Sequence, residues 1–249
     1  MTQDISYTTK TKQLIDNLKS VCANYGLGND GNEFKIITQV FLYKFLNDKF
    51  RSEIKKKKDT LDKDLDDELL MDLLDENVPR LKPHQLIDHL HNIQNKGDFA
   101  KTFDDTLRDI SIENANIFSI KSYTGAKDLL FDELSQYISD ASQRDAFCKA
   151  LINKLFEFSF EESFETYFEE KYDFFKDIFE YLIKDYNSDS GGKYAEYYTP
   201  NAVSRIIAQI LVADKTVKQA LCYDPSVGSG SLLLSLAHQI GEDKCTLYT

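Results

Sequence analysis

The sequence predicts a mainly α-helical N-terminal part followed by the start of an α/β domain with a parallel sheet. Glycine and proline number only 10 and 4 among 249 residues, and apolar residues recur at helical spacing through the N-terminal part. Near the C-terminus the pattern changes to a short apolar run, a glycine turn, an apolar helix and a second apolar run. That order is typical of a parallel β-α-β unit.

Two amphipathic helices are expected first. Gly26 and Gly28 should end the first helix, which covers residues 8–25, and the turn GNDGNEF should lead into the second. The apolar positions of the first are Leu14, Ile15, Leu18, Val21, Cys22 and Tyr25, and those of the second are Phe34, Ile37, Phe41 and Phe45.

A charged segment follows, with KKKK at 55–58 and DKDLDDE at 62–68. Because the opposite charges partly cancel, we expect a solvated helix or a partly ordered hairpin. Contact of Lys55–Lys58 with phosphate groups is the alternative. The stretch HQLIDHLHNI at 84–93 predicts a short helix, and its histidines at 84, 89 and 91 lack the i, i+4 spacing of a helical metal site, so we expect none.

Helical spacing is strong from residue 126 to residue 186. The run at 144–158 places Phe147, Leu151, Leu155 and Phe158 on one face. Residues 164–186 carry aromatic side chains at intervals of three and four, which usually indicates core.

Charge and cysteine spacing limit the possible functions and compartments. The formal net charge is -12, which argues against a protein that coats a nucleic-acid backbone; any DNA contact should be small or shared with a basic partner. The cysteines at 22, 148, 222 and 245 are widely spaced, so free buried thiols in a reducing compartment are expected rather than zinc. The sequence has no apolar signal core and no apolar stretch of membrane-spanning length, so we expect a cytoplasmic location.

The pattern changes at the polar loop 187–193. A helix should begin at Thr199, with the threonine as N-cap and Pro200 in the first helical position, and end near Asp214. Its apolar stripe comprises Val203, Ile206, Ile207, Ile210 and Leu211.

A strand, ALCY at 220–223, is expected next, then the turn DPSVGSG at 224–230, a helix at 231–240 and a second strand, CTLY, at 245–248. Gly228 and Gly230 would let a ligand approach the backbone. The N–H groups of Ser229, Gly230 and Ser231 would face a carboxylate, phosphate or hydroxyl, and Asp224 would accept from an amine. A plain strand-to-helix turn is the alternative, and two strands do not complete such a sheet.

The string Asp-Pro-Ser-Val-Gly-Ser-Gly-Ser, with an aromatic residue before it, resembles motif I of the amino-group DNA methyltransferases, which binds S-adenosylmethionine. GGKYAEYYTP at 191–200 resembles their motif X. Motif X ahead of motif I is the order of the gamma arrangement, typical of N6-adenine enzymes. DIFEYLI at 177–183 resembles the entry to this domain in the modification subunits of type I restriction–modification systems.

The resemblance implies a helical N-terminal domain over residues 1–165 and, over 166–249, the N-terminal part of a Rossmann-like, S-adenosylmethionine-dependent methyltransferase domain. It implies that one group of residues lines the binding site for the methionine end of the cofactor, namely Glu196, Tyr197, Tyr198, Thr199 and Pro200. It implies that Asp224 binds the cofactor ammonium directly or through water and that the backbone at Ser226, Gly228, Ser229 and Gly230 cradles its amino-acid moiety.

One departure from the family concerns the catalytic motif, Asn/Asp-Pro-Pro-Phe/Tyr, which is absent from this sequence. We therefore expect the N-terminal portion of a longer modification subunit, inactive by itself in methyl transfer to adenine N6. Its implied partners are DNA, a specificity subunit and a restriction subunit in a hetero-oligomer, without membrane or metal. A helical interaction module that holds such subunits or DNA without catalysis is the alternative, and a methyltransferase acting on RNA or protein is a third possibility.

Overall fold

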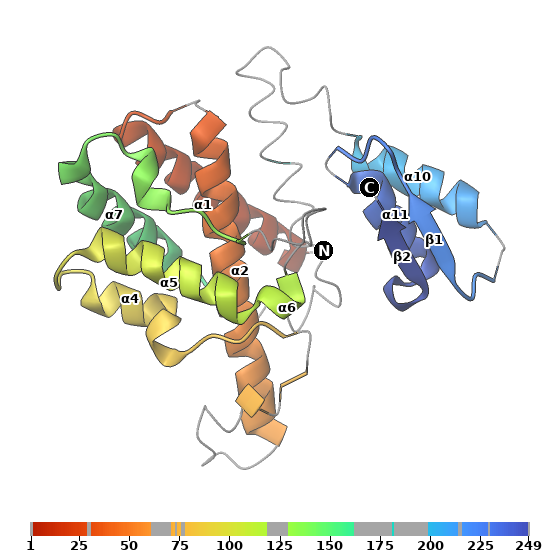
Figure 1. Ribbon diagram of the computed structural model, residues 1–249, viewed down its shortest axis with the longest axis horizontal. Coiled ribbons are helices and arrows are strands. Elements are labelled where there is room, and N and C mark those ends of the chain that lie inside the picture. The colour runs from red at the N-terminus through yellow and green to blue at the C-terminus, as the bar shows by residue number, and fades with distance from the viewer. Residues whose placement is uncertain are drawn as a thin grey trace. The chain divides into compact units, whose positions relative to one another are not determined.

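The chain divides into two compact units, Met1–Phe175 and Lys176–Thr249, each of which is described by itself (Figure 1). A computed structural model describes residues 2–28, 31–60, 71–72, 74–75, 78–118, 129–161, 181, 199–213, 216–228 and 230–248. The expected domain boundary after residue 165 lies outside these residues and stays a prediction. No described helix has the length and apolar character needed to cross a membrane.

The regular elements among the described residues of unit 1 are all helices. Helix α7 contacts α1, α4 and α5, while the long helix α2 runs through the unit (Figure 1). The elements are α1 (Thr2–Asn24), α2 (Gly31–Thr60), η1 (Pro83–Gln85), α4 (Ile87–Ile93), α5 (Phe99–Glu113), α6 (Ala115–Phe118), η2 (Leu134–Tyr137), η3 (Ala141–Gln143) and α7 (Arg144–Phe156).

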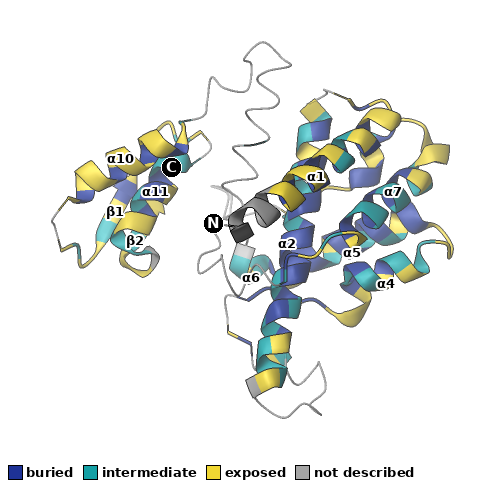
Figure 2. Ribbon diagram, turned by 180° about the vertical axis from the view of Figure 1, so that it is seen from behind, coloured by how far each residue is buried: buried dark blue, intermediate teal, exposed yellow. Residues whose placement is uncertain are grey.

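Helix α2 is buried on nearly all sides, although its sequence indicated a single apolar stripe (Figure 2). Every residue from 43 to 48 is buried, including Lys44, Asn47 and Asp48. Their polar groups are paired: Tyr43 Oη donates to the Gln85 carbonyl at 2.6 Å. Lys44 Nζ lies 3.0 Å from Asp48 Oδ1. A helix surrounded by protein needs such partners because a buried polar group without one is costly.

The helices expected in unit 1 are confirmed in part. Leu14, Ile15 and Leu18 are fully buried on α1, which begins at Thr2 rather than at residue 8. Helix α2 continues through the lysine run 55–58, whereas residues 62–68 lie outside the described part.

The long helical run expected from 126 to 186 is wrong at its start. The short 3-10 turns η2 and η3 lie between residues 134 and 143, and α7 begins only at Arg144. Its face of Phe147, Leu151 and Leu155 is buried as expected, but Phe158 lies beyond the end of the helix. Asp140 accounts for one of these breaks, because its side chain accepts the N–H of Ser142 and so favours a turn over a helix. The aromatic run 164–186 falls almost wholly outside the described residues.

Unit 2 contains the expected strand, turn, helix and second strand. Its elements are α10 (Asn201–Val212), β1 (Ala220–Tyr223), α11 (Ser231–Ile240), η5 (Glu242–Lys244) and β2 (Cys245–Tyr248). The strands pair in parallel, from Ala220 opposite Cys245 to Tyr223 opposite Tyr248. The described residues form a two-stranded sheet only, so a Rossmann-like domain stays a prediction.

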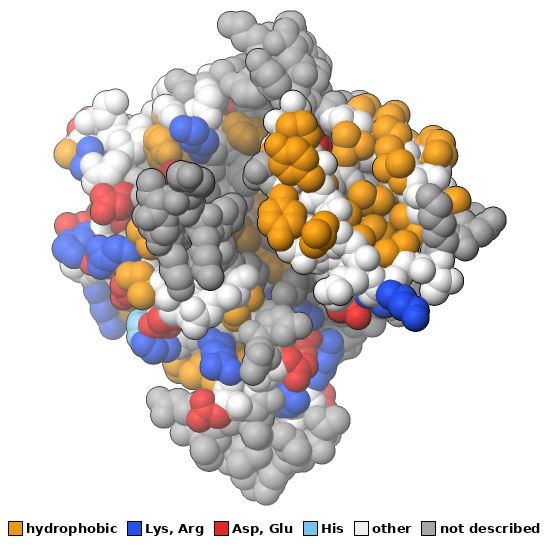
Figure 3. Space-filling model, turned by 45° about the vertical axis from the view of Figure 1, so that its right-hand side comes forward, with side chains coloured by type: hydrophobic (Ala, Val, Ile, Leu, Met, Phe, Trp, Pro, Cys, Tyr) orange, Lys and Arg blue, Asp and Glu red, His pale blue; other side chains and the backbone are white. Residues whose placement is uncertain are grey.

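Helix α10 has two contrasting faces. The face that is buried carries Asn201, Ser204, Ala208 and Val212. The apolar stripe expected from the sequence, which we call the outer face of α10, is exposed among the described residues and comprises Val203, Ile206, Ile207, Ile210 and Leu211. Figure 3 shows apolar side chains gathered on the surface of unit 2. The small side chains allow close packing on α11, where Ser235 Oγ donates to Ser204 Oγ at 2.9 Å.

The start of α10 differs by one residue from the expectation. Pro200 occupies the N-cap position with extended backbone, φ -54° and ψ 139°, and the helix begins at Asn201. The Pro200 carbonyl accepts the N–H groups of Val203 and Ser204. Thr199 therefore precedes the cap, and no side chain caps this helix.

Candidate functional site

The turn between β1 and α11 is organised around Asp224. Its N–H donates to the Tyr248 carbonyl at 3.1 Å, which fixes the residue at the end of the sheet. Its Oδ1 accepts the N–H of Ser226 at 2.9 Å, and this bond turns the chain away from the strand. A second bond, from Gly230 N–H to the Val227 carbonyl at 2.8 Å, closes the turn.

Two glycines give this turn a backbone that other residues adopt with difficulty. Gly228 has φ 52° and Gly230 has φ 78°, both in the left-handed region. Gly230 is the N-cap of α11, and no side chain caps that helix. A Cβ added at Gly230 would lie 3.7 Å from Leu234 Cδ1, an ordinary contact, so the conformation rather than crowding calls for glycine there.

The turn combines a half-buried carboxylate with exposed residues. Asp224 Oδ2 has no hydrogen-bond partner among the described residues, and Ser226 and Gly228 are exposed. The Gly230 N–H, which was expected to face a ligand, donates to the Val227 carbonyl in this structure, and the place of Gly230 in a cofactor site stays a prediction. The part played by the Val227 carbonyl was not predicted, since a backbone acceptor leaves no signal in the residue type. Ser229 lies outside the described residues.

The second group of expected cofactor residues is only partly described. Glu196, Tyr197 and Tyr198 lie outside the described residues. Thr199 is half-buried and Pro200 exposed at the start of α10. Helix α10, which follows Thr199 and Pro200, packs on α11, which follows the turn.

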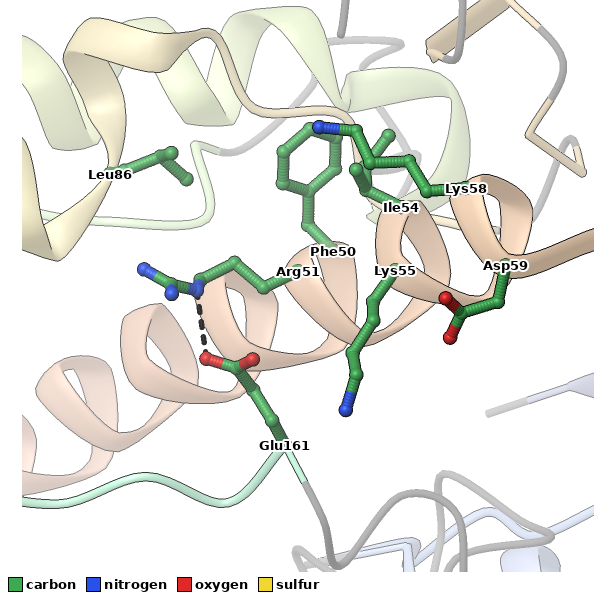
Figure 4. A pocket seen from close by; sticks show the side chains of 8 residues that line it. All are labelled: Phe50, Arg51, Ile54, Lys55, Lys58, Asp59, Leu86 and Glu161. Carbon is green, nitrogen blue, oxygen red and sulfur yellow. Dashed lines mark ion pairs between the residues drawn. The ribbon is translucent and has the colours of Figure 1, made fainter. Parts of the chain in front are cut away.

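Unit 1 contains a separate cavity of about 550 Å³ near the end of α2 (Figure 4). Phe50, Ile54 and Leu86 give it apolar walls, and Lys55 and Lys58 lie on its lining. Arg51 is paired with two carboxylates: its Nε lies 2.7 Å from Glu161 Oε1, and its guanidinium also pairs with Asp88. The Arg51 charge is therefore neutralised by carboxylates, and contact of Lys55–Lys58 with phosphate groups stays a prediction.

The surroundings of one histidine and of the cysteines can be described individually. The His91 ring stacks on Phe156 with centroids 3.9 Å apart, as a packing contact. The described residues contain no group of three or more His, Cys, Asp or Glu suited to a metal ion. All four cysteines are free; three are buried and Cys245 is half-buried.

Comparisons with known proteins match part of the chain. Residues 170–247 match the family described as N-6 DNA Methylase. Over 73 residues, the chain is 36% identical to the type I restriction enzyme MpnII methylase subunit of Mycoplasma pneumoniae. That alignment covers 29% of this chain and 13% of the relative. The resemblance to an N6-adenine modification subunit is thereby confirmed, and it supports a methyltransferase function.

Proposed function

We propose that this chain is the cofactor-binding, N-terminal portion of a type I modification subunit, which methylates adenine N6 in DNA from S-adenosylmethionine. The observation that carries the proposal is the turn at 224–230. There a strand-end carboxylate, one oxygen of which has no hydrogen-bond partner among the described residues, precedes two glycines at positive φ and the start of a helix. Ligands of parallel α/β sheets bind beyond the carboxyl ends of the strands, where this turn lies.

The residues of the turn fit the amino-acid end of S-adenosylmethionine. Asp224 Oδ2 would accept from the ammonium group, while Oδ1 keeps the turn in shape by accepting from Ser226. The exposed backbone at Gly228, which has no Cβ, allows a ligand carboxylate to approach, and the start of α11 favours negative charge. Glu196, Tyr197, Tyr198, Thr199 and Pro200 are proposed to wall the methionine end, and Ser226, Ser229 and Gly230 to complete the cradle.

When bound, S-adenosylmethionine supplies a methyl group on a sulfonium, which the adenine amino group attacks. The described residues would bind and orient the cofactor for this reaction. The sequence contains no Asn/Asp-Pro-Pro-Phe/Tyr motif, because none of its four prolines is followed by another. In adenine methylation that motif holds the extruded base. We therefore propose that the chain binds the cofactor but does not transfer the methyl group by itself.

The proposed partners are DNA, a specificity subunit and a restriction subunit, in a cytoplasmic hetero-oligomer. The support is the similarity to a type I methylase subunit together with the net charge of -12, which favours protein partners over extensive direct DNA contact. Co-elution with a specificity subunit in size-exclusion chromatography tests the assembly, and separate elution of the two proteins would count against it.

Isothermal titration calorimetry with S-adenosylmethionine tests the cofactor site. Substitution Asp224→Asn keeps an acceptor for the Ser226 N–H but removes the charge that faces the ammonium. A hydrogen bond to a charged group is worth about 1.5–3 kcal/mol, so affinity should fall roughly 10- to 100-fold. The matched control is Asp243→Asn, an exposed aspartate of the same unit, which should bind as the unaltered chain does. Equal affinity of the Asp224 variant and this control would exclude the assignment.

A further inference from the structure

A chain of hydrogen bonds joins α10 and α11, which lie side by side in unit 2 (Figures 1 and 2). Ser235 Oγ of α11 donates to Ser204 Oγ of α10 at 2.9 Å, and Ser204 Oγ donates in turn to the Asn201 carbonyl at 3.0 Å. All three residues are buried. Ser204 therefore gives its single proton to its own helix and accepts a hydrogen bond from the other, so one buried hydroxyl links the two helices.

The serine pair lies close to both described segments of the proposed cofactor site. Helix α10 directly follows Thr199 and Pro200, and α11 directly follows the turn 224–230. Ser204 lies three residues after the start of α10, and Ser235 lies four residues after the start of α11. At a rise of about 1.5 Å per residue, each serine is therefore about one turn from the start of its helix. The pair joins the helices near the ends at which the two segments enter them.

Neither helix start is restrained by a cap of its own. Among the described residues, no side chain caps either helix: the N-cap of α10 is Pro200, and that of α11 is Gly230. The buried face of α10 also carries Ala208 and Val212, but apolar packing is non-directional. A hydrogen bond is directional, and a buried polar contact between helices specifies one register where apolar contacts permit several. The serine pair is thus suited to fix how the two helix starts lie relative to each other.

We infer that Ser204 and Ser235 are positioning residues of the proposed cofactor site, which hold Thr199 and Pro200 in one arrangement relative to the turn 224–230. Both serines are buried in the contact between the helices, so they act through the helix starts and do not touch the cofactor. The inference rests on the proposed function, because it takes both segments to bind S-adenosylmethionine.

Close packing alone is the competing explanation for two serines at this contact, because small side chains let helices approach closely. The double substitution Ser204→Ala/Ser235→Ala separates the two roles, since alanine is similarly small but has no hydroxyl. Replacement of both partners of a hydrogen bond by apolar groups of similar shape is nearly neutral for stability, whereas Ser204→Ala alone leaves the Ser235 hydroxyl without this acceptor. A purely structural role therefore predicts that the double variant binds the cofactor as the unaltered chain does.

Isothermal titration calorimetry of the full chain with S-adenosylmethionine tests the inference, together with urea unfolding followed by the amide NMR signals of unit 2. We expect the double variant to unfold at nearly the same urea concentration as the unaltered chain. It should nevertheless bind the cofactor about threefold or more weakly, because only a fraction of its molecules holds both segments in the competent arrangement. Ser235→Ala alone keeps the bond from Ser204 to Asn201 but breaks the link between the helices, so it should weaken binding similarly and decides the matter if the double variant unfolds. Unaltered affinity in the folded serine variants would overturn the inference.

Ala208→Gly is the matched control. Ala208 is buried on the same face of α10 as Ser204, and glycine in a helix interior lowers stability without altering the serine pair. This variant should unfold at a lower urea concentration but bind S-adenosylmethionine with unaltered affinity. An equal loss of affinity in Ala208→Gly and in the double serine variant would refute positioning by the serines.

The same titrations separate this inference from the proposed function. Absence of binding by the unaltered chain would overturn the proposed function and the inference with it. Binding that is weakened by Asp224→Asn but not by the serine substitutions would overturn the inference alone.

Discussion

Asp48 and Phe160 are joined across 112 residues: Asp48 Oδ2 accepts the backbone N–H of Phe160 at 2.8 Å. The same carboxylate pairs with Lys44 and accepts from Asn47 Nδ2 at 2.8 Å. Both side chains of the ion pair are almost fully buried, at 4% and 1% exposure. One carboxylate thus holds the chain that leaves α7 against the middle of α2.

Removal of this carboxylate should strongly destabilise unit 1. Asp48→Ala leaves the buried Lys44 ammonium without its partner, and breaking a buried pair costs about 3–5 kcal/mol. Urea unfolding followed by circular dichroism should show that loss. Asp59→Ala, at the exposed end of the same helix, should change the free energy of unfolding by less than about 0.5 kcal/mol. Equal effects of the two variants would contradict the role of the pair.

The pH dependence of stability should change when Asp104 is replaced. Burial raises the pKa of this carboxyl, against the stabilising hydrogen bond from Ser135 Oγ at 2.6 Å. With a raised folded-state pKa, the unfolded state loses its proton first, so stability falls as pH rises above the unfolded value of about 3.9. Asp104→Asn removes this loss. The free energy of unfolding of the variant, relative to that of the unaltered chain, should therefore rise as the pH increases from about 3 to about 7. Unfolding measured at intervals of about one pH unit follows this change. A pH-independent difference would contradict the prediction.

The cysteines should differ sharply in reactivity. Burial raises the pKa of the Cys22 thiol to about 12, with a further contribution from Glu33, and burial also raises that of Cys148. Thiolates are the reactive species, so neither residue should react with iodoacetamide at pH 8 while the protein is folded. Cys245, which is half-buried, should be alkylated first. Peptide mass mapping after short labelling measures this order, and labelling in urea provides the reference for full access.

Substitutions that change side-chain size should reduce stability much more on the buried face of α10 than on its outer face. Ser204 is fully buried against α11, so Ser204→Ile should overpack the contact and cost about 1–3 kcal/mol. Ile206 is 55% exposed, so Ile206→Ser should cost less than about 0.5 kcal/mol in the chain alone. Thermal unfolding of the two variants compares them directly. A larger loss from Ile206→Ser would show that the outer face is buried in solution.

The sequence predicted those features that depend on residue type at short range. ALCY and CTLY form the two strands, and residues 231–240 form a helix closed by Gly241, which adopts φ 106°. The strand, the glycine turn and the helix each have a local physical cause. The resemblance to the family was likewise recognised from short sequence motifs.

Features set by distant partners could not be predicted in this way. Residues 43–48 do not by themselves indicate that α2 is buried on nearly all sides. The segments that pack against this helix are distant in the sequence and include Gln85 and Phe160. The apolar stripe of α10 indicated a buried face, yet the helix packs on α11 through Ser204 and Ala208, since small side chains permit a close approach that large ones prevent. At the candidate site, the position of Asp224 directly after β1 could be predicted and its role stays a prediction, whereas the bond that occupies the Gly230 N–H is a property of the backbone.

The bonds made by α2 also bear on the synthesis of the protein. Tyr43 donates to the Gln85 carbonyl, 42 residues away, and Asn47 Oδ1 accepts from the Ile87 N–H, 40 residues away. Asp48 accepts from the Phe160 N–H, 112 residues away. On the ribosome, α2 emerges long before the last of these partners. At a synthesis rate of about 5–20 residues per second, Lys44 and Asp48 remain without this partner for several seconds. Nascent chains arrested before Phe160 leaves the exit tunnel should therefore be protease-sensitive, and chains arrested after it should be resistant.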